Sequence, residues 1–396
     1  MRVAVIFNEV PPESGGAFTF QAALVASLAL VESTSQHSFV FYMVAGGGSA
    51  PEGYITIPQS LSARSHRTII TAIRDGYDRL NLRRPRWRTW FERSLESQKV
   101  DFVWFASNYI EDCGQPFFCT VWDLAHVTTP WFPEVSKDGE WERRQHYYGR
   151  MLPKAARIIV SNEAGRRAIQ QAFPVADERF ICLPMPTPDF ALDAMTDTND
   201  LGAKVSGLGV TQPYLFYPAQ YWAHKNHVGA LRALAQARRG GQRDDLSLVF
   251  VGSDKGQEAF LSQEASNLGL SEHVHFLGFV TVTELVALYR EAHALLYLSF
   301  FGPENLPPLE ALALSCPVIC SDVPGMREQL GDAAVFVAPT DPSAAAIAVE
   351  GLFRPEQRAH LVEKGLELAA ERTAGRYVAR VLRELDEFDP IRSCWS

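Results

Sequence analysis

The sequence offers its clearest candidate for binding chemistry in residues 300–331. A loop over residues 301–305 precedes a predicted helix from Leu306 to Leu314, and Pro307 suits the first turn of this helix because its missing N–H would have no partner there. The first turn of a helix presents free backbone N–H groups and a partial positive charge, which favour an anion. We therefore expect Asn305 and Leu306 to lie beside an anionic ligand, with phosphate as the favoured group.

Glu310 lies about one turn inside this predicted helix and is flanked by apolar residues. A carboxylate in that position can accept two hydroxyl hydrogen bonds, as a ribose would supply. The alternative is a solvated residue in an ordinary strand-helix-strand unit. Residues 316–320 then predict a short buried strand, and residues 321–325 predict the loop at its carboxyl end, where open α/β sheets bind ligands.

Two loops in the first half of the chain carry further candidate ligand groups. Gly15 and Gly16 come between a predicted strand and a predicted helix, an arrangement that lets the backbone approach a ligand closely but is also common in ordinary turns. Asp123 and His126 follow a predicted strand over residues 117–122, together with threonines and aromatic residues, and such groups bind sugars. The alternative for His126 is a structural histidine.

Length and composition predict a globular protein of two domains. The chain has 396 residues, of which 47% are hydrophobic and 21% are charged, and no apolar run reaches the ~20 residues that span a bilayer. The net charge of −9 argues against nucleic-acid binding, which needs a basic surface. The six cysteines lack metal-ligand spacing, and the apolar run of residues 3–7 is too short for a signal peptide. We therefore expect a cytoplasmic protein with free thiols.

One segment departs from this acidic composition. Between Arg64 and Arg93 the chain has nine arginines against three acidic residues, and Trp87, Trp90 and Phe91 lie among them. Basic residues interleaved with aromatic residues suit an anionic membrane surface, where a lipid-linked acceptor would be reached. The alternative is a solvated helix whose aromatic residues pack onto the sheet. The first interpretation predicts peripheral contact with the inner face of the membrane.

Residues 300–331 resemble the donor-sugar signature of family 4 glycosyltransferases, which are retaining enzymes of the two-domain GT-B fold. The shared features are a helix that begins near Leu-Pro, the glutamate Glu310, and the following Cys-Pro-Val-Ile, Ser-Asp and Pro-Gly-x-x-Glu sequences. The usual family pattern is Glu-x7-Glu, but Gly302 occupies the first position here and Glu304 is the nearest acid. The GPENLPPLEA loop therefore indicates a subgroup, and the sequence leaves open whether Glu304 replaces the missing acid.

The resemblance implies roles for residues in both halves of the chain. The family holds its diphosphate with Arg-x4-Lys, and here Lys225 matches the lysine whereas Gln220 stands in place of the arginine. No D-x-D metal motif is apparent, so neither a metal ion nor another cofactor is expected. Catalytic or acceptor-orienting roles are implied for His126, Asp123, Lys225 and Glu304. Donor contacts are implied for Gly16, Gln220, Lys225, Gly252, Val280, Asn305, Leu306 and Glu310, with Val280 beside the base and Glu310 on the ribose.

The resemblance and the order of predicted elements together imply the α/β GT-B fold, in which two Rossmann-like, doubly wound domains face a cleft. The expected acceptor-side domain covers residues 1–187, and a linker rich in Pro, Asp and Thr covers residues 188–212. The nucleotide-sugar-binding domain is expected at residues 213–372. Residues 373–396 are expected to form a helix that returns to the first domain.

These features predict a retaining glycosyltransferase that moves a hexose from a nucleoside-diphosphate sugar to a saccharide or lipid-linked acceptor in polysaccharide biosynthesis. The GPENLPPLEA sequence of the subgroup favours mannose as the transferred sugar. Two alternatives stay open: a GT-B nucleotide-sugar 2-epimerase, and a nucleotide-sugar-binding subunit with weak or no activity, which Gly302 and Gln220 make credible. The sequence discloses neither the base nor the acceptor.

Overall fold

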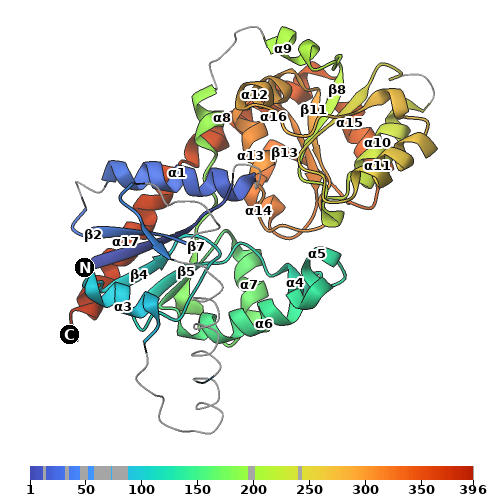
Figure 1. Cartoon of the computed structure of the whole chain (residues 1–396). Helices are drawn as coiled ribbons and strands as arrows, with labels where there is room; N and C mark the ends of the chain where they lie inside the picture. Colours follow the sequence, from blue (N-terminus) through green and yellow to red (C-terminus); the bar gives the residue numbers. More distant parts are fainter. Residues whose placement is uncertain are drawn as a thin grey trace.

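The computed structural model describes residues 1–11, 15–31, 35–44, 52–57, 73, 88–194, 201–239 and 243–395. Within these residues the chain forms two parallel β-sheets connected by helices, and the sheets lie in the two lobes seen in Figure 1. Every strand pair is parallel, and helices connect most successive strands, although β4 and β5 are joined by a loop without a helix. This architecture confirms the predicted fold class of two Rossmann-like α/β units.

The first sheet has seven strands in the order β3-β2-β1-β4-β5-β6-β7. Its strand β1 is apolar and fully buried from Val3 to Phe7, as expected for a parallel strand covered on both faces. The order reverses between β1 and β4, and the loops that follow two such strands diverge and leave a crevice. The strands are β1 (Arg2–Asn8), β2 (Ser38–Val44), β3 (Ile55–Ile57), β4 (Phe102–Phe105), β5 (Phe117–Thr120), β6 (Arg157–Val160) and β7 (Phe180–Cys182).

Capping side chains fix where several helices of the first lobe begin. Thr89 and Glu92 form a reciprocal capping box at the start of α3, and Asn162 Oδ1 accepts the N–H of Gly165 at 3.0 Å at the start of α7. The helical elements of this lobe are α1 (Gly16–Val31), α3 (Trp90–Ser97), α4 (Ala125–Thr128), α5 (Pro133–Ser136), η2 (Lys137–Gly139), α6 (Glu140–Met151), η3 (Leu152–Lys154), α7 (Glu163–Ala172) and η4 (Asp177–Arg179).

The second sheet has six strands in the order β10-β9-β8-β11-β12-β13, so its own reversal lies between β8 and β11. The strand predicted at residues 316–320 begins two residues later, at Val318, and runs to Ser321. The strands are β8 (Tyr214–Pro218), β9 (Ser247–Val251), β10 (Val274–Phe276), β11 (Ala294–Tyr297), β12 (Val318–Ser321) and β13 (Ala334–Val337). The helical elements are α8 (Asp189–Asp193), α9 (Leu201–Gly207), η6 (Ala223–Lys225), α10 (His227–Arg238), α11 (Glu258–Asn267), η7 (Ser271–His273), α12 (Val282–Glu291), α13 (Leu306–Ala313), α14 (Met326–Leu330), η8 (Gly331–Ala333), α15 (Pro342–Gly351) and α16 (Pro355–Glu371).

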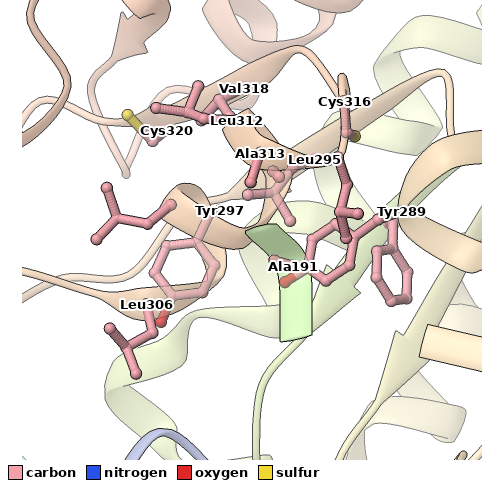
Figure 2. Close-up of a cluster of buried hydrophobic side chains, with 14 of the residues drawn as sticks. Ala191, Tyr289, Leu295, Tyr297, Leu306, Leu312, Ala313, Cys316, Val318 and Cys320 are labelled. Carbon is pink, nitrogen blue, oxygen red and sulfur yellow. The ribbon is translucent and has the colours of Figure 1, made fainter. Parts of the chain in front are cut away.

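Helix α13 is fixed on this sheet by a buried apolar cluster. Figure 2 shows Leu312 and Ala313 of the helix among side chains of β11 and β12, including Leu295 and Val318. All four are at most 2% exposed. A fully buried leucine or valine contributes about 1.5–3 kcal/mol. The apolar cluster therefore holds the helix, and with it the start of the helix, in one position.

The last helix, α17 (Ala374–Arg392), packs against the first lobe although it follows the second (Figure 1). The ring of Phe388 lies 5.1 Å from that of Phe102 in β4, and the ring of Tyr377 lies 5.5 Å from that of Phe20 in α1. The chain therefore passes between the lobes before β8 and again before α17.

Candidate active site

A cavity of about 580 Å³ lies between the two lobes. The first lobe lines it with residues that follow β1, β5 and β7, and the second with residues at the ends of β8 and β11 and in the loops beyond them. The carboxyl ends of strands at a reversal of strand order are where open α/β sheets bind ligands. Of the eleven residues with an expected catalytic or donor-binding role, seven line this cavity: Gly16, Asp123, Gln220, Lys225, Glu304, Asn305 and Leu306.

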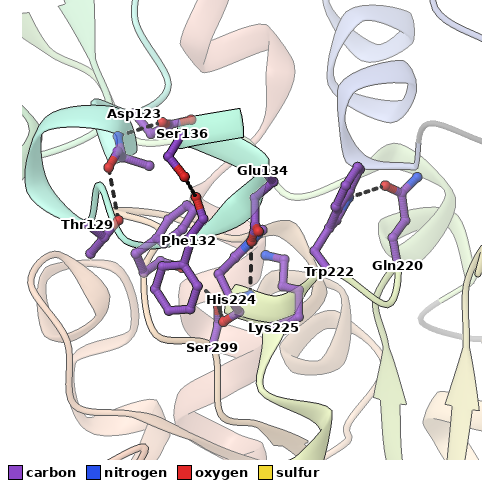
Figure 3. Close-up of polar contacts among 12 residues, drawn as sticks. Asp123, Thr129, Phe132, Glu134, Ser136, Gln220, Trp222, His224, Lys225 and Ser299 are labelled. Atoms are coloured by element: carbon purple, nitrogen blue, oxygen red, sulfur yellow. Dashed lines mark hydrogen bonds and ion pairs between the residues drawn. The ribbon is translucent and has the colours of Figure 1, made fainter. Parts of the chain in front are cut away.

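Lys225 is the cation of the cavity wall on the second lobe (Figure 3). Its Nζ donates hydrogen bonds to Tyr297 Oη at 2.7 Å and to Asn305 Oδ1 at 3.0 Å. Burial lowers the pKa of Lys225 to about 8, against the opposing influence of the Asp123 and Glu134 carboxylates. Among the described residues no carboxylate comes within 4.0 Å of Nζ. A buried cation with neutral partners is a binding group for an anion.

The start of α13 lies beside Lys225. Asn305 occupies the N-cap position, but its side chain does not cap the helix, because Oδ1 accepts the hydrogen bonds from Lys225 and Tyr297. Its backbone is held instead by Gln329, whose amide accepts from Asn305 N at 3.1 Å and donates to Asn305 O at 2.7 Å. The next two helical residues after Leu306 are prolines without an N–H, so Leu306 carries the foremost backbone donor.

Glu310 lies one turn further along α13 and is 7% exposed. Its Oε2 accepts a hydrogen bond from Tyr289 Oη at 2.6 Å. Burial raises the pKa of Glu310 to about 7, although the hydrogen bond from Tyr289 opposes this shift. The structure brings Glu310 next to the cavity-lining turn of the helix but not onto the cavity wall itself.

Glu304 lines the cavity, but its carboxylate is engaged in contacts between chain segments. Oε2 accepts the backbone N–H of Met185 at 2.6 Å, and Oε1 pairs with Arg372 at 3.1 Å. Burial raises the pKa of Glu304 to about 7, and Arg372 counteracts this effect. Met185 follows β7 and Arg372 ends α16, so Glu304 connects the loop before α13 with the segments that join the lobes. Whether it replaces the acid missing at Gly302 stays a prediction.

On the first lobe, Asp123 and His126 occupy different surroundings. Asp123 lines the cavity, accepts the N–H of Ala125 at 2.8 Å and pairs with Arg144 at 3.4 Å. His126 is 0% exposed, and its ring stacks on that of Tyr148 at 5.7 Å. Burial lowers the pKa of His126. The structure therefore places Asp123 at the cavity and His126 in the interior behind it.

The remaining residues predicted to bind the sugar donor lie in different places, some on the cavity wall and others away from it. Gly16 lies against α13, since a Cβ added to it would meet Leu306 Cδ1 at 3.3 Å. Gln220 accepts a hydrogen bond from Trp222 Nε1 at 2.8 Å. Gly252 and Val280 are not on the cavity wall. Gly252 has φ +149° and a Cβ there would meet the carbonyl oxygen of the residue after β8 at 2.4 Å, so its role here is close packing of two loops.

One contact between the lobes was not predicted from the sequence. Glu134 of α5 pairs with His224 of η6 (Figure 3): Glu134 Oε1 accepts the backbone N–H of His224 at 3.0 Å and the Nδ1–H of its ring. Burial lowers the pKa of His224 to about 4, so the ring is neutral at pH 7. Burial raises the pKa of Glu134, but the hydrogen bonds from His224 outweigh it and hold that pKa below its ordinary value. In this pair, therefore, a carboxylate accepts a hydrogen bond from a neutral imidazole.

Most of the basic segment between Arg64 and Arg93 lies outside the described residues. Of its aromatic residues within them, Phe91 is buried and Trp90 is 40% exposed. No described helix combines the length and apolar character needed to cross a bilayer. In the described ranges no three His, Cys, Asp or Glu side chains gather closely enough to hold a metal ion. Membrane contact and independence from metal ions stay predictions.

The fold and cavity can be compared with known proteins. Anabaena HepE, in a crystal structure with UDP and glucose, superimposes with a TM-score of 0.69 at 16% identity, covering 97% of this chain and 99% of that chain. The two lobes thus form the GT-B fold. Residues 201–367, which contain Lys225 and the whole of α13, match the family described as Glycosyl transferases group 1.

Two curated relatives agree with this match. The O-antigen chain mannosyltransferase RfbU of Salmonella typhimurium is 34% identical over 120 residues, which are 30% of this chain and 33% of the relative. The O-antigen chain mannosyltransferase B of Escherichia coli is 24% identical over 259 residues, 65% of each chain. This chain therefore covers a third to about two thirds of the length of these relatives, and the similarity supports a relation to glycosyltransferases.

Proposed function

We propose that the protein is a retaining glycosyltransferase of family 4 that moves a hexose from a nucleoside-diphosphate sugar to a hydroxyl group of a saccharide or lipid-linked acceptor in polysaccharide biosynthesis. The observation that carries this proposal is that Lys225, a cation with no carboxylate partner among the described residues, lies beside the start of α13, which no side chain caps there, in a cavity between two lobes. The similarity to two O-antigen mannosyltransferases supports polysaccharide assembly and favours mannose.

The chemistry follows from charge. Departure of the nucleoside diphosphate is the difficult step, because negative charge grows on its phosphate oxygens. Lys225 Nζ and the Leu306 N–H lie on one wall and would stabilise that charge without reorganising. Asn305 Oδ1 and Tyr297 Oη hold Nζ in place by accepting hydrogen bonds from it. The family's arginine is replaced here by Gln220, so Lys225 would be the cation that the second lobe offers to the diphosphate, while Arg144 lines the cavity from the first lobe.

The first lobe supplies groups for the acceptor. Asp123 is part-exposed at the cavity and is oriented by Arg144 and by the N–H of Ala125. It would accept a hydrogen bond from the acceptor hydroxyl or from the donor sugar. We propose no covalent nucleophile. Glu310 would hold the ribose, which requires that a bound donor reach the second oxygen of a carboxylate already bonded to Tyr289.

Incubation with donor alone separates this function from its alternatives. We expect GDP-mannose or UDP-glucose to be hydrolysed slowly to the nucleoside diphosphate and an unchanged hexose when no acceptor is present. A 2-epimer of the sugar formed without an acceptor would instead indicate an epimerase. Donor binding without any turnover in the presence of saccharide acceptors would indicate a binding subunit. Failure to bind any nucleoside diphosphate would refute the proposal.

A further inference from the structure

A second cavity of about 410 Å³ adjoins the first. The two cavities share Glu134 and Trp222 on their walls, so these two side chains separate them. The outer walls come from both lobes: η2 and the ends of α5 and α6 on the first, and η6 with the loop before α11 on the second. A ligand that extends from the first cavity past Glu134 and Trp222 would enter the second.

Two residues that line the second cavity each have a buried side-chain oxygen with no partner in the described part of the chain. The side chain of Glu134 is 8% exposed, and while Oε1 accepts two hydrogen bonds from His224, Oε2 is buried without a partner among the described residues. Tyr221 is 0% exposed, and its hydroxyl has no partner within the same set of residues. Buried polar atoms are nearly always hydrogen-bonded, so two such atoms beside one cavity indicate a polar ligand.

Trp222 gives the shared wall a flat, fixed surface. Its Nε1 donates to Gln220 Oε1 at 2.8 Å, which sets the orientation of the ring, and the Lys255 ammonium lies over one face of the ring, 5.3 Å from the ring centroid (Figure 3 shows Trp222 and Gln220). The face of an indole packs well against the C–H groups on one side of a sugar ring, and neighbouring polar groups then meet its hydroxyls.

The charges around the second cavity distinguish a saccharide from a phosphate. Its wall has three carboxylates, Glu134, Asp138 and Glu140, against the two ammonium groups of Lys137 and Lys255, but Glu140 is paired with Arg143 and Arg144, so Glu134 is the carboxylate that matters for a ligand. A diphosphate would be repelled by Glu134, which is ionised at neutral pH because its pKa is held below the ordinary value. An uncharged polyhydroxylated chain can donate hydroxyl hydrogen bonds to the Glu134 carboxylate and is not repelled by its charge.

We propose that the second cavity is a subsite for the saccharide acceptor, in which a sugar ring packs on Trp222 and donates hydroxyl hydrogen bonds to Glu134 Oε2 and Tyr221 Oη. This inference rests on the proposed glycosyltransferase function and adds to it the path of the acceptor. The acceptor hydroxyl that reacts lies in the first cavity, and the preceding sugar units of the acceptor lie in the second.

The test uses the full chain on an array of bacterial polysaccharide fragments, with UDP or GDP added to fill the first cavity. Gln257→Trp fills the second cavity from the loop before α11 and leaves every residue of the first cavity in place. Gln263→Trp is the matched control, because it adds the same side chain to an exposed position of α11. We expect the wild type and Gln263→Trp to retain the same fragments. The binding signal of Gln257→Trp for those fragments should be at least tenfold lower. Tyr221→Phe, which removes only the hydroxyl, should lower the signal severalfold.

The outcomes separate the subsite from the proposed function. Nucleoside-diphosphate affinity of each variant is measured by calorimetry alongside the array. If the nucleotide binds normally but no fragment is retained by the wild type, or if Gln257→Trp retains fragments as well as Gln263→Trp does, the subsite is overturned and the glycosyltransferase proposal stands. If the nucleotide does not bind to the wild type, the proposed function fails and the subsite fails with it.

Discussion

Replacement of Lys225 by alanine should weaken nucleoside-diphosphate binding strongly. In the unliganded protein Nζ is held by Tyr297 Oη at 2.7 Å and Asn305 Oδ1 at 3.0 Å, and it faces the cavity without a carboxylate partner among the described residues. A hydrogen bond to a charged group contributes about 1.5–3 kcal/mol, and each 1.4 kcal/mol is a factor of ten in affinity. We therefore expect the dissociation constant for UDP or GDP to rise about tenfold to a hundredfold.

Isothermal titration calorimetry on the purified full chain measures this change directly. Lys364→Ala is the matched control, because the Lys364 side chain on α16 is 42% exposed and pairs with Glu367. Thermal denaturation of the unliganded variants verifies that both fold. Unchanged nucleotide affinity in a folded Lys225→Ala protein would refute the assignment of Lys225 to the diphosphate, and an equal loss in Lys364→Ala would show that the effect is one of overall charge.

Three further predictions concern pH and backbone geometry. Because the pKa of Lys225 is about 8 and phosphate binding favours its protonated form, the affinity for UDP should fall above pH 8, by up to about tenfold per pH unit, and Lys225→Ala should show no such fall by calorimetry. Glu310 has a folded pKa of about 7, above its ordinary value of 4.5, so the folded state binds more protons and the free energy of unfolding should fall as the pH rises from about 4.5 to 7. Glu310→Gln should remove on the order of 3 kcal/mol of that fall in urea denaturation, and parallel pH profiles of the two proteins would contradict this. Gly325→Ala should lower the free energy of unfolding by more than about 1 kcal/mol and by more than Gly331→Ala, because a Cβ at Gly325 (φ +94°) would meet a backbone carbonyl oxygen at 2.3 Å, whereas a Cβ at Gly331 (φ +49°) would meet open space. Equal losses would show that the contact is unimportant.

The sequence predicted the parts of the site that depend on local chain structure. The helix start at Leu306 follows from a proline in the first turn and the apolar residues after it, and α13 begins at that residue. The fold class follows from alternating strands and helices, and the two parallel sheets confirm it. Lys225 was indicated by its match to the Arg-x4-Lys pattern of the resembled family, and the structure brings it to Asn305, eighty residues away.

What the sequence could not predict are contacts between distant segments. The Glu134 and His224 side chains meet across the lobes and belong to no spacing pattern, since ninety residues separate them. The carboxylate of Glu304 is bonded to Arg372 and Met185, which a local pattern cannot indicate. Burial is likewise a property of the packed structure.

His126 illustrates the same limit within a single motif. Its neighbours along the chain suggested a residue at the cavity, but one helical turn is enough to point Asp123 to the cavity and the His126 ring toward Tyr148. The sequence therefore indicates which loops reach the cavity more reliably than which side chains of those loops line it.

We propose that the start of α13 and Lys225 together hold a diphosphate between the two lobes. Crystal structures of the protein with UDP, GDP, ADP and dTDP offered in turn test this proposal. At least one nucleotide is expected to bind with its phosphate oxygens within hydrogen-bond distance of Lys225 Nζ and the Leu306 N–H. A nucleotide bound outside this cavity, or a cavity that stays without nucleotide in all four experiments, would contradict it.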